Sequence, residues 1–441
     1  MINLEVKTNF HQLQIIRKNT PRKMHKKKVI IVGGGLAGLS AAYVLSKQEG
    51  FETHLIEKNN RLGGRVVSCI INGQTIDVGG FLVYPWYKNY HELILELNLT
   101  EELIKIPTAR DYFASDQKLD NAYDQEFKLS YKDMVEIFIG VFPNQLIDND
   151  PTEPELNAYG NLTVSDYIKT LNIDAEKINY YMRVFDTYLQ GYCYGSVTEH
   201  KMAFMAATLF QNILHGDMHA ASYLKNGSKI FIDALQKELE IRGVQFHFNC
   251  TLEKIDDKKI VTNSGEMEAD YFVFCHNLSQ ISYSKFITAT VSYSGTAMVE
   301  NDLEWGSCFY IEKKQLFSVL SVVNLHKLYT EKTSKYLNLN IKVNDSKSTH
   351  INTQDLLKII KKEMQEHFKD ITILELVNRV DWDKAMPVAT EDFVEFIREK
   401  QGQNNSYYAG DFMGCPSMET ALVSGKRAAL ELIQDMNLNL Y

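Results

Sequence analysis

The sequence predicts an α/β fold, because a strand, a helix and a second strand follow one another at the start of its folded part. Residues 28–32 (KVIIV) are apolar and β-branched, a pattern typical of a strand buried on both faces of a parallel sheet. Glycines then break this strand, and residues 36–47 form an alanine-rich helix that ends before Gly50. Residues 51–57 are the second strand. This βαβ unit predicts a parallel sheet.

Further along the chain, two kinds of segment alternate. One continues the pattern of a parallel sheet with its helices, namely 229–242 (helix), 244–248 (strand), 407–411 (strand) and 418–434 (helix). The other comprises helical stretches rich in tyrosine and phenylalanine over 86–223, alternating antiparallel strands over 286–350 and a helix over 354–368. A hairpin is predicted between residues 259–262 and 267–275.

The turn after the first strand has the spacing of a dinucleotide-binding fingerprint. Gly33, Gly35 and Gly38 form a G-x-G-x-x-G pattern, and Glu57 ends the second strand about 20 residues further on. The glycines allow a tight turn, the approach of a pyrophosphate to the backbone, and close packing of helix on strand. Because strand, helix and acid are in register, the pattern predicts an ADP-containing cofactor. A glycine-rich turn that only packs is the alternative.

Additional glycine turns and a second helix start indicate which dinucleotide binds. They lie in RLGGR (61–65), DVGG (77–80) and AGD (409–411), and the candidate residues are Gly64, Arg65, Gly80, Gly410, Asp411 and Met418. Arg65 can neutralise pyrophosphate charge. The helix beginning near Met418 would bring a second positive helix end to the cofactor, which suits a ring that becomes anionic when reduced. A flavin has this need and a nicotinamide does not.

These motifs resemble the FAD-dependent amine oxidase superfamily, which includes monoamine and polyamine oxidases, protoporphyrinogen oxidase, and phytoene- and squalene-type desaturases. The matching segments are VIIVGGGLAGLSAAYVL (29–45), HLIEKNNRLGGRVVS (54–68), DVGG (77–80) and YYAGDFMGCPSMETALVSGKRAA (407–429). Weaker matches are NGS (226–228), TLEKI (251–255), ADYFVFC (269–275) and DWDKAMP (381–387). The remaining middle segments resemble the family only in their general pattern of residue types and contain none of its motifs.

The resemblance implies a role for each matching residue. Gly33, Gly35 and Gly38 would contact the pyrophosphate, Glu57 the ribose, Arg65 the pyrophosphate or ribityl oxygens, Leu252 the adenine through its backbone, Asp411 the ribityl or phosphate region, and Met418 the flavin O2 through its N–H. Trp382 would lie beside the flavin ring, in the family's W-x-x-A-x-P segment. Tyr84 and Trp86 follow the DVGG turn, so they are also ring-side candidates.

Two departures from the family pattern bear on the chemistry. Members that attach FAD covalently use a cysteine upstream of the C-terminal motif, whereas residues 385–400 contain none, so the resemblance implies noncovalent FAD. Monoamine-oxidase-type members place an aromatic residue directly before the Met-Glu pair, where this chain has Ser417. A cage for an amine cation is therefore incomplete, as in the desaturases.

Other candidate residues have weaker claims. His215 and His219 could share a helix face as metal ligands, but no third ligand cluster accompanies them, so no metal is expected. The tyrosines at 180, 181, 188, 192 and 194 could line an apolar tunnel or pack in the core. Cys415 could be a redox thiol or a buried free cysteine. No catalytic acid or base is evident, which suits a flavin reaction in which the protein mainly positions the substrate.

Chain length and motif order predict the domain organisation. The 441 residues exceed one ordinary hydrophobic core. We expect a discontinuous, Rossmann-like FAD-binding domain over 28–85, 225–285 and 388–441, and an interleaved α+β substrate domain over 86–224 and 286–387. Residues 1–27 are basic and are expected to be a disordered leader, with a targeting or membrane-surface segment, or a true start at Met24, as alternatives.

Charge and cysteine usage restrict the partners and the compartment. The net charge is −9 and basic residues concentrate at the N-terminus, so no nucleic-acid partner is expected. The six cysteines contain no CxxC pair, which favours reduced thiols and a cytoplasmic protein. The longest uncharged stretch, 29–45, is glycine-rich and too short for a membrane-spanning helix. Peripheral membrane contact stays an alternative.

The sequence therefore favours an FAD-dependent oxidoreductase that takes a hydride from a small, apolar or isoprenoid-like substrate, as a desaturase or dehydrogenase does. Oxygen or a quinone would be the electron acceptor. A flavin amine oxidase that releases peroxide is the second hypothesis. A flavin-binding protein without redox turnover, including a mutase, is a hypothesis of another class. The substrate, the acceptor and the oligomeric state are left open.

Overall fold

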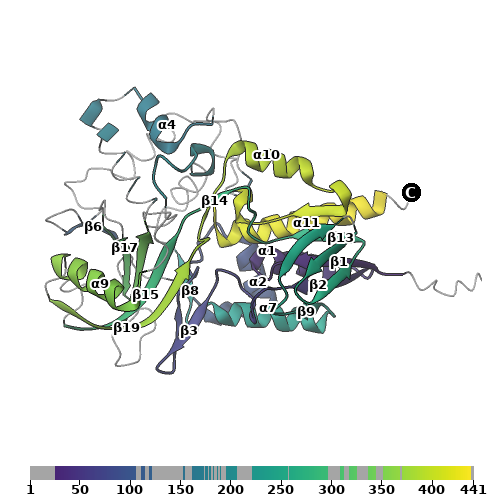
Figure 1. Cartoon of the computed structure of the whole chain (residues 1–441), viewed down its shortest axis with the longest axis horizontal. Coiled ribbons are helices and arrows are strands. Elements are labelled where there is room, and N and C mark those ends of the chain that lie inside the picture. The colour runs from purple at the N-terminus through teal and green to yellow at the C-terminus, as the bar shows by residue number, and fades with distance from the viewer. Residues whose placement is uncertain are drawn as a thin grey trace, which may run out of the picture.

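The computed structural model describes residues 25–105, 161–172, 195–205, 221–295 without Asp257, 336–343, 351–367 and 370–438, together with the backbone of strands 111–114, 119–121, 308–311 and 317–324 and scattered residues between 152 and 189. A parallel sheet with its helices forms one side of the molecule, and an antiparallel sheet with α9 (Thr353–His367) forms the other (Figure 1). The α/β fold class is confirmed.

The parallel sheet draws its strands from distant parts of the chain. Its order is β21-β13-β1-β2-β9, and all four pairings are parallel. The strands are β1 (Lys27–Val32), β2 (Phe51–Ile56), β9 (Gln245–His247), β13 (Tyr271–Phe274) and β21 (Ser406–Tyr408). Because all strands run in one direction, the turns after β1, β2, β13 and β21 meet at the same edge of the sheet.

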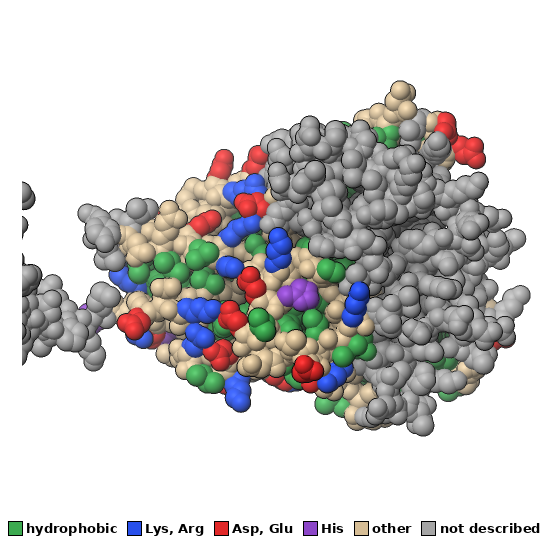
Figure 2. All heavy atoms as spheres, turned by 180° about the vertical axis from the view of Figure 1, so that it is seen from behind, with side chains coloured by type: hydrophobic (Ala, Val, Ile, Leu, Met, Phe, Trp, Pro, Cys, Tyr) green, Lys and Arg blue, Asp and Glu red, His purple; other side chains and the backbone are tan. Residues whose placement is uncertain are grey.

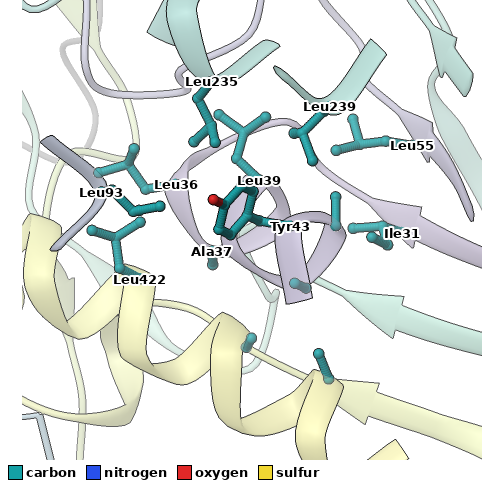
Figure 3. Close-up of a cluster of buried hydrophobic side chains, with 14 of the residues drawn as sticks. Ile31, Leu36, Ala37, Leu39, Tyr43, Leu55, Leu93, Leu235, Leu239 and Leu422 are labelled. Atoms are coloured by element: carbon teal, nitrogen blue, oxygen red, sulfur yellow. The ribbon is translucent and has the colours of Figure 1, made fainter. Parts of the chain in front are cut away.

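Alternate residues of β1 belong to two different cores. Val29 and Ile31 belong to the largest cluster, with α1 (Leu36–Ser46), α2 (Lys88–Glu96), α7 (Lys229–Ile241) and α11 (Met418–Leu438). Figure 3 shows Leu235 and Leu239 of α7 and Leu422 of α11 around α1 in this cluster. Ile30 and Val32 belong to the cluster on the opposite face. The strand is thus buried on both faces, as its apolar run predicts.

The hairpin prediction is wrong in its second strand. The opposite face of the parallel sheet is covered by β10 (Leu252–Asp256), β11 (Lys259–Thr262) and β12 (Gly265–Glu268), and β11 pairs with β12. The predicted partner segment 267–275 is divided at Ala269 and Asp270, and its second part becomes β13 of the parallel sheet. All four residues of β13 are buried, so this run suits a central strand and not an exposed hairpin.

The second sheet is antiparallel, in the order β17-β18-β15-β19. Its strands are β15 (Phe286–Gly295), β17 (Phe317–Asn324), β18 (Tyr336–Val343) and β19 (Ile371–Trp382). One face presents residues such as Ala289, Val291 and Leu339 to α9, and these form a separate apolar core. The other face combines an apolar cluster, in which Tyr336 packs with Ile71, Ile76 and Val78, with a polar contact: Asn338 donates a hydrogen bond to the carbonyl of Asp77 at 2.6 Å.

Shorter elements complete the described part of the chain. They are β3 (Ser68–Ile71), β4 (Gln74–Asp77), β5 (Leu103–Lys105), β6 (Asp111–Ala114), β7 (Leu119–Asn121), α4 (Val164–Thr170), β8 (Ser222–Leu224), β14 (Ser282–Tyr283), β16 (Cys308–Ile311), β20 (Pro387–Val388) and α10 (Glu391–Lys400). The antiparallel pair β14–β20 crosses between the two parts of the molecule, beside the carboxyl edge of the parallel sheet. Seen from behind, the described surface intersperses acidic and basic side chains (Figure 2).

Candidate cofactor site

Glycine is required at two positions of the turn after β1. Gly33 has a φ of 110°, and a Cβ there would lie 2.7 Å from the carbonyl oxygen of Cys275. A Cβ on Gly38 would lie 1.9 Å from the carbonyl oxygen of Gly33. Any side chain would separate α1 from the turn or the turn from the end of β13. The glycines thus place the start of α1 directly at the carboxyl edge of the sheet.

The N-terminus of α1 is open. Gly35 is its N-cap, no side chain caps this end, and the first turn contains no acidic residue. A Cβ on Gly35 would have only the Cα of Gly64 near it, at 4.0 Å, while Gly64 itself has a φ of 57°. The turn of residues 61–65 is held here by the N–H of Gly63, which donates to the carbonyl of Gly34 at 2.8 Å. The free N–H groups of this helix end suit an anion.

Glu57 is buried beside the glycine turn and is fixed through both of its oxygens. Its Oε2 accepts from the N–H of Gly34 at 2.8 Å, and its Oε1 accepts from the backbone and side-chain nitrogens of Asn59 at 2.9 and 2.7 Å. A carboxylate has about four acceptor positions, so it can still accept from a hydroxyl. Asn59 was not identified from the sequence, although its position two residues after Glu57 could have indicated that it holds this carboxylate.

Arg65 joins the N-terminal and C-terminal motifs. Its Nη2 donates to Oδ1 of Asp411 at 2.7 Å, and its Nη1 donates to the carbonyl of Ala385 at 2.5 Å. The Asp411 side chain is 8% exposed and that of Arg65 is 33% exposed, so the pair lies at a partly open boundary. Two residues predicted to bind the cofactor are therefore brought together from opposite ends of the chain.

The DVGG turn meets the start of α11. A Cβ on Gly79 would lie 2.0 Å from the carbonyl oxygen of Arg65, so this turn and the 61–65 turn are in backbone contact. A Cβ on Gly80 would lie 3.6 Å from the sulfur of Met418. The structure thus brings the three glycine turns and the beginnings of α1 and α11 to one place. We call this set of residues (33–38, 57–65, 79–80, 410–411 and 418) the cofactor cradle.

Ser417 caps α11. Its Oγ accepts from the N–H of Thr420 at 3.0 Å, while the hydroxyl of Thr420 donates to the carbonyl of Cys415 at 2.6 Å. Serine is a preferred N-cap residue because its oxygen satisfies a free N–H of the first turn. The small side chain at this position therefore has a structural role in addition to leaving space where an aromatic residue could stand.

The remaining site candidates lie in three other places. Leu252 begins β10 and packs with the cluster on the far face of the parallel sheet. Trp382 ends β19, where its Nε1 donates to the hydroxyl of Thr288 at 3.1 Å. Trp86 is buried in the main core, with the ring of Tyr87 edge-on at 4.5 Å, and Tyr84 packs partly buried beside them.

Several candidates fall outside the described residues. His215, His219 and the tyrosines at 180, 181, 188, 192 and 194 are among them. In the described part of the chain, His, Cys, Asp and Glu side chains form no group of three that could hold a metal ion. Nor does any helix among the described residues have the length and apolar character needed to cross a membrane.

Asp77 lies beside the cradle and holds neighbouring elements together, although the sequence indicated it only as part of the DVGG turn. It is 1% exposed, and its Oδ1 accepts from the N–H of Ser228 at 2.8 Å and from the hydroxyl of Ser68 at 2.5 Å. Ser228 precedes α7, so Asp77 caps that helix from a distant part of the chain. Because its carbonyl also binds Asn338, Asp77 connects the cradle to the antiparallel sheet.

The donor set of the cradle fits a flavin dinucleotide. An open helix N-terminus and Arg65 suit the pyrophosphate, Glu57 suits a ribose hydroxyl, and the start of α11 offers a second positive helix end. At Gly35 no atom of the described residues beyond its chain neighbours and its own helix lies closer than 4.0 Å to the position of a Cβ, so a side chain there would take up space beside the open helix end.

Comparison with known proteins identifies the family. The model of the flavin containing amine oxidoreductase family matches residues 36–301. A 4,4'-diaponeurosporene oxygenase of Staphylococcus haemolyticus is 35% identical over 102 residues, which are 22% of this chain and about a fifth (20%) of that relative's length. A coproporphyrinogen III oxidase of Staphylococcus aureus is 21% identical over an alignment that covers 93% of this chain and 100% of the relative. Among solved structures, a protein assigned as a protoporphyrinogen oxidase from Exiguobacterium has a TM-score of 0.71 at 18% identity, over 93% of this chain and 100% of that one.

The chain belongs to the flavin-containing amine oxidoreductase family, because the family model matches more than half of it. It is a flavin-dependent oxidoreductase, and the resemblance to the FAD-dependent amine oxidase superfamily is confirmed.

Proposed function

We propose that the cradle binds FAD noncovalently and that the protein uses it to remove hydride from an apolar or isoprenoid-like substrate. The observation that carries the cofactor half of this proposal is the uncapped N-terminus of α1, enclosed by glycines and flanked by Arg65 and Glu57. The absence of cysteine from 385–400 supports noncovalent binding.

The chain's own residues support a role in positioning and excluding water. The carboxylate of Glu419 in the first turn of α11 is bound to backbone N–H groups, and the hydroxyl of Ser417 caps the helix. Neither group is therefore available as a general base. When bound, the flavin supplies the two-electron acceptor that takes hydride at N5. The protein's contribution is then to hold a substrate C–H beside the ring and to keep water away.

The overall reaction proposed is a desaturation or dehydrogenation. The substrate would lose a hydride and a proton from neighbouring atoms and gain a double bond, and oxygen or a quinone would take up the two electrons and two protons, as peroxide or a quinol. The local similarity to a 4,4'-diaponeurosporene oxygenase supports a long apolar substrate, and Ser417 supports it because an aromatic amine cage is incomplete.

Amine oxidation is the second candidate, because the matching family model is that of amine oxidoreductases. In that case a primary or secondary amine would lose hydride from its α-carbon, and oxygen would be reduced to peroxide. Ser417 is the residue that counts against this reaction.

The test is anaerobic mixing of the FAD-loaded protein with apolar isoprenoids, a porphyrinogen, polyamines and aromatic amines. We expect the visible flavin absorption to disappear with an isoprenoid and to return when oxygen or a quinone is added. Reduction by an amine with peroxide release would reverse the ranking. Flavin that stays oxidised with every class would overturn the proposed redox function and favour a structural or mutase role.

A further inference from the structure

A histidine that the family motifs do not include lies at the edge of the cradle. His276 is two residues beyond the end of β13, next to the glycine turn that follows β1. The N–H of Cys275 donates to the carbonyl of Val32 at 2.8 Å, and the backbone nitrogen of His276 is 3.3 Å from where a Cβ of Gly33 would lie. Because β1 and β13 are parallel neighbours, His276 and the pyrophosphate turn share the carboxyl edge of the sheet.

The ring of His276 is held with one nitrogen unpaired. It lies edge-on to Phe274 at 5.9 Å, and Phe274 in turn packs against Tyr408 at 5.4 Å. Its Nδ1 is buried and has no hydrogen-bond partner among the described residues. A buried polar atom without a partner is costly, so in a native protein it calls for an explanation, and a bound group that pairs with it is one.

The charged groups around His276 favour an anion. Lys384 approaches from the segment before β20, and its ammonium lies 5.5 Å from the ring of Tyr283 on β14. Tyr283 has its pKa raised to about 12, by burial and then by Asp411, while Arg65 acts in the opposite direction. His276 has its pKa lowered to about 4 by burial and by Lys384. Lys384 is thus the charged group that acts on His276, whereas Arg65 and Asp411 form an ion pair on the other side of Tyr283, and Cys275 is buried with a raised pKa and neutral.

We propose that His276 is a further cofactor-binding residue, whose Nδ1–H donates a hydrogen bond to the pyrophosphate or ribityl oxygens of FAD. The inference rests on the proposed function, since it takes FAD as the occupant of the cradle. The anion would satisfy the unpaired nitrogen and would balance the positive charge of Lys384.

This role has two measurable consequences. Loss of one buried hydrogen bond to a charged group weakens binding about tenfold or more. In addition, a bound anion favours the protonated imidazole, so the pKa of His276 would rise on binding. Cofactor binding would then take up a proton, and the affinity for FAD would increase as the pH falls from neutral toward the pKa of the free protein.

The experiment titrates FAD into the full-length apoprotein, with flavin fluorescence as the readout, across the pH range in which the apoprotein is folded. The variants are His276→Ala and His276→Asn, whose amide can place an N–H near the position of Nδ1 but does not titrate. We expect the alanine variant to bind about tenfold more weakly at neutral pH. The asparagine variant should recover most of the affinity and lose the increase at lower pH. His25→Ala, at the exposed amino end of β1, is the matched control and should behave as the wild type.

The outcomes separate this inference from the proposed function. If the wild type takes up no FAD, the proposed function fails. If the wild type binds FAD and both His276 variants bind equally well with the same pH dependence, the inference alone is overturned. Circular dichroism checks the fold of each variant, and the asparagine variant keeps the test decisive should the alanine variant not fold.

Discussion

At the residue scale, buried carboxylates in this protein bind backbone N–H groups of distant segments. Glu57 receives the N–H of Gly34, Asp77 receives that of Ser228 before α7, and Glu419 receives those of Asn89 and Tyr90 in α2. A carboxylate at a helix N-terminus is favourable because it satisfies free N–H groups and faces the positive end of the helix. Each of these acids therefore stabilises a contact between two segments that are distant in the sequence and that meet in or beside the cradle.

Glu419→Gln tests this arrangement. Glu419 is 2% exposed and its two oxygens accept from the backbone N–H groups of Asn89 at 2.7 Å and Tyr90 at 3.0 Å. A glutamine would turn an amide NH₂ toward one of these donors, so we expect the free energy of unfolding to fall by about 1–3 kcal/mol. Urea unfolding measures the change. Glu268→Gln, at an exposed position of β12, should leave stability unchanged, and an equally stable Glu419 variant would contradict the capping role.

At the element scale, the edge strand β9 of the parallel sheet is joined to its neighbour β2 by a pair of histidines. Nδ1 of His54 on β2 lies 3.0 Å from Nε2 of His247 on β9, the rings are stacked at 5.3 Å, and the other nitrogen of His54 lies 2.9 Å from Glu52. A hydrogen bond between two imidazoles needs one ring to act as an acceptor, which a protonated ring cannot do. The pairing of β2 with β9 therefore favours at least one neutral histidine.

This pair predicts a loss of stability in mild acid. The pKa of His247 is lowered in the folded protein by burial, then by His54 and Lys28. A histidine whose pKa is lower in the folded state than the unfolded value of about 6.5 binds its proton more readily when unfolded. Stability should therefore be constant well above that value and fall as the pH drops below it. Chemical unfolding of the wild type and of His247→Gln at a series of pH values measures this. The variant should show a shallower fall, and identical slopes would exclude the pair as a cause.

Secondary structure was predictable where local signals suffice. The strand at 27–32, α1, α7 and α11 follow from apolar patterns and glycines. The hairpin over 259–275 was wrong because the end of the polar strand β12 and the apolar strand β13, separated by Ala269 and Asp270, read as one strand. Only the space beside β1 decides that the second run joins the parallel sheet.

At the scale of the whole molecule, the cradle is assembled from segments far apart in the chain. Arg65 binds Asp411 across 346 positions, and Gly425 allows α11 to cross α1, because a Cβ there would lie 2.0 Å from the carbonyl oxygen of Ala37. A ligand that binds such a site only when the chain is folded stabilises the entire fold, since every contributing segment must be in place.

We therefore expect FAD to raise the thermal stability of the apoprotein in a concentration-dependent way. The free energy gained should follow the logarithm of free FAD above its dissociation constant, reaching about 2.7 kcal/mol at a hundredfold excess over that constant. Differential scanning calorimetry with increasing FAD measures the effect, with adenosine as a control that lacks the pyrophosphate and the ring. A melting temperature that does not respond to FAD would contradict the cradle as its binding site.

The sequence by itself determined the class of fold, the positions of the glycine turns and the acid after β2, because these depend on neighbours within a few residues. Only the tertiary structure decided that Asp77 and Glu419 cap remote helices. It likewise decided that Ser417 caps α11 and that Arg65 is bound to Asp411. It also placed His276 at the carboxyl edge of the parallel sheet, beside the cradle. Helix ends, ion pairs and sheet edges are satisfied by whatever side chain is near in space. That neighbour is chosen by how the sheets and helices pack, which no local pattern records.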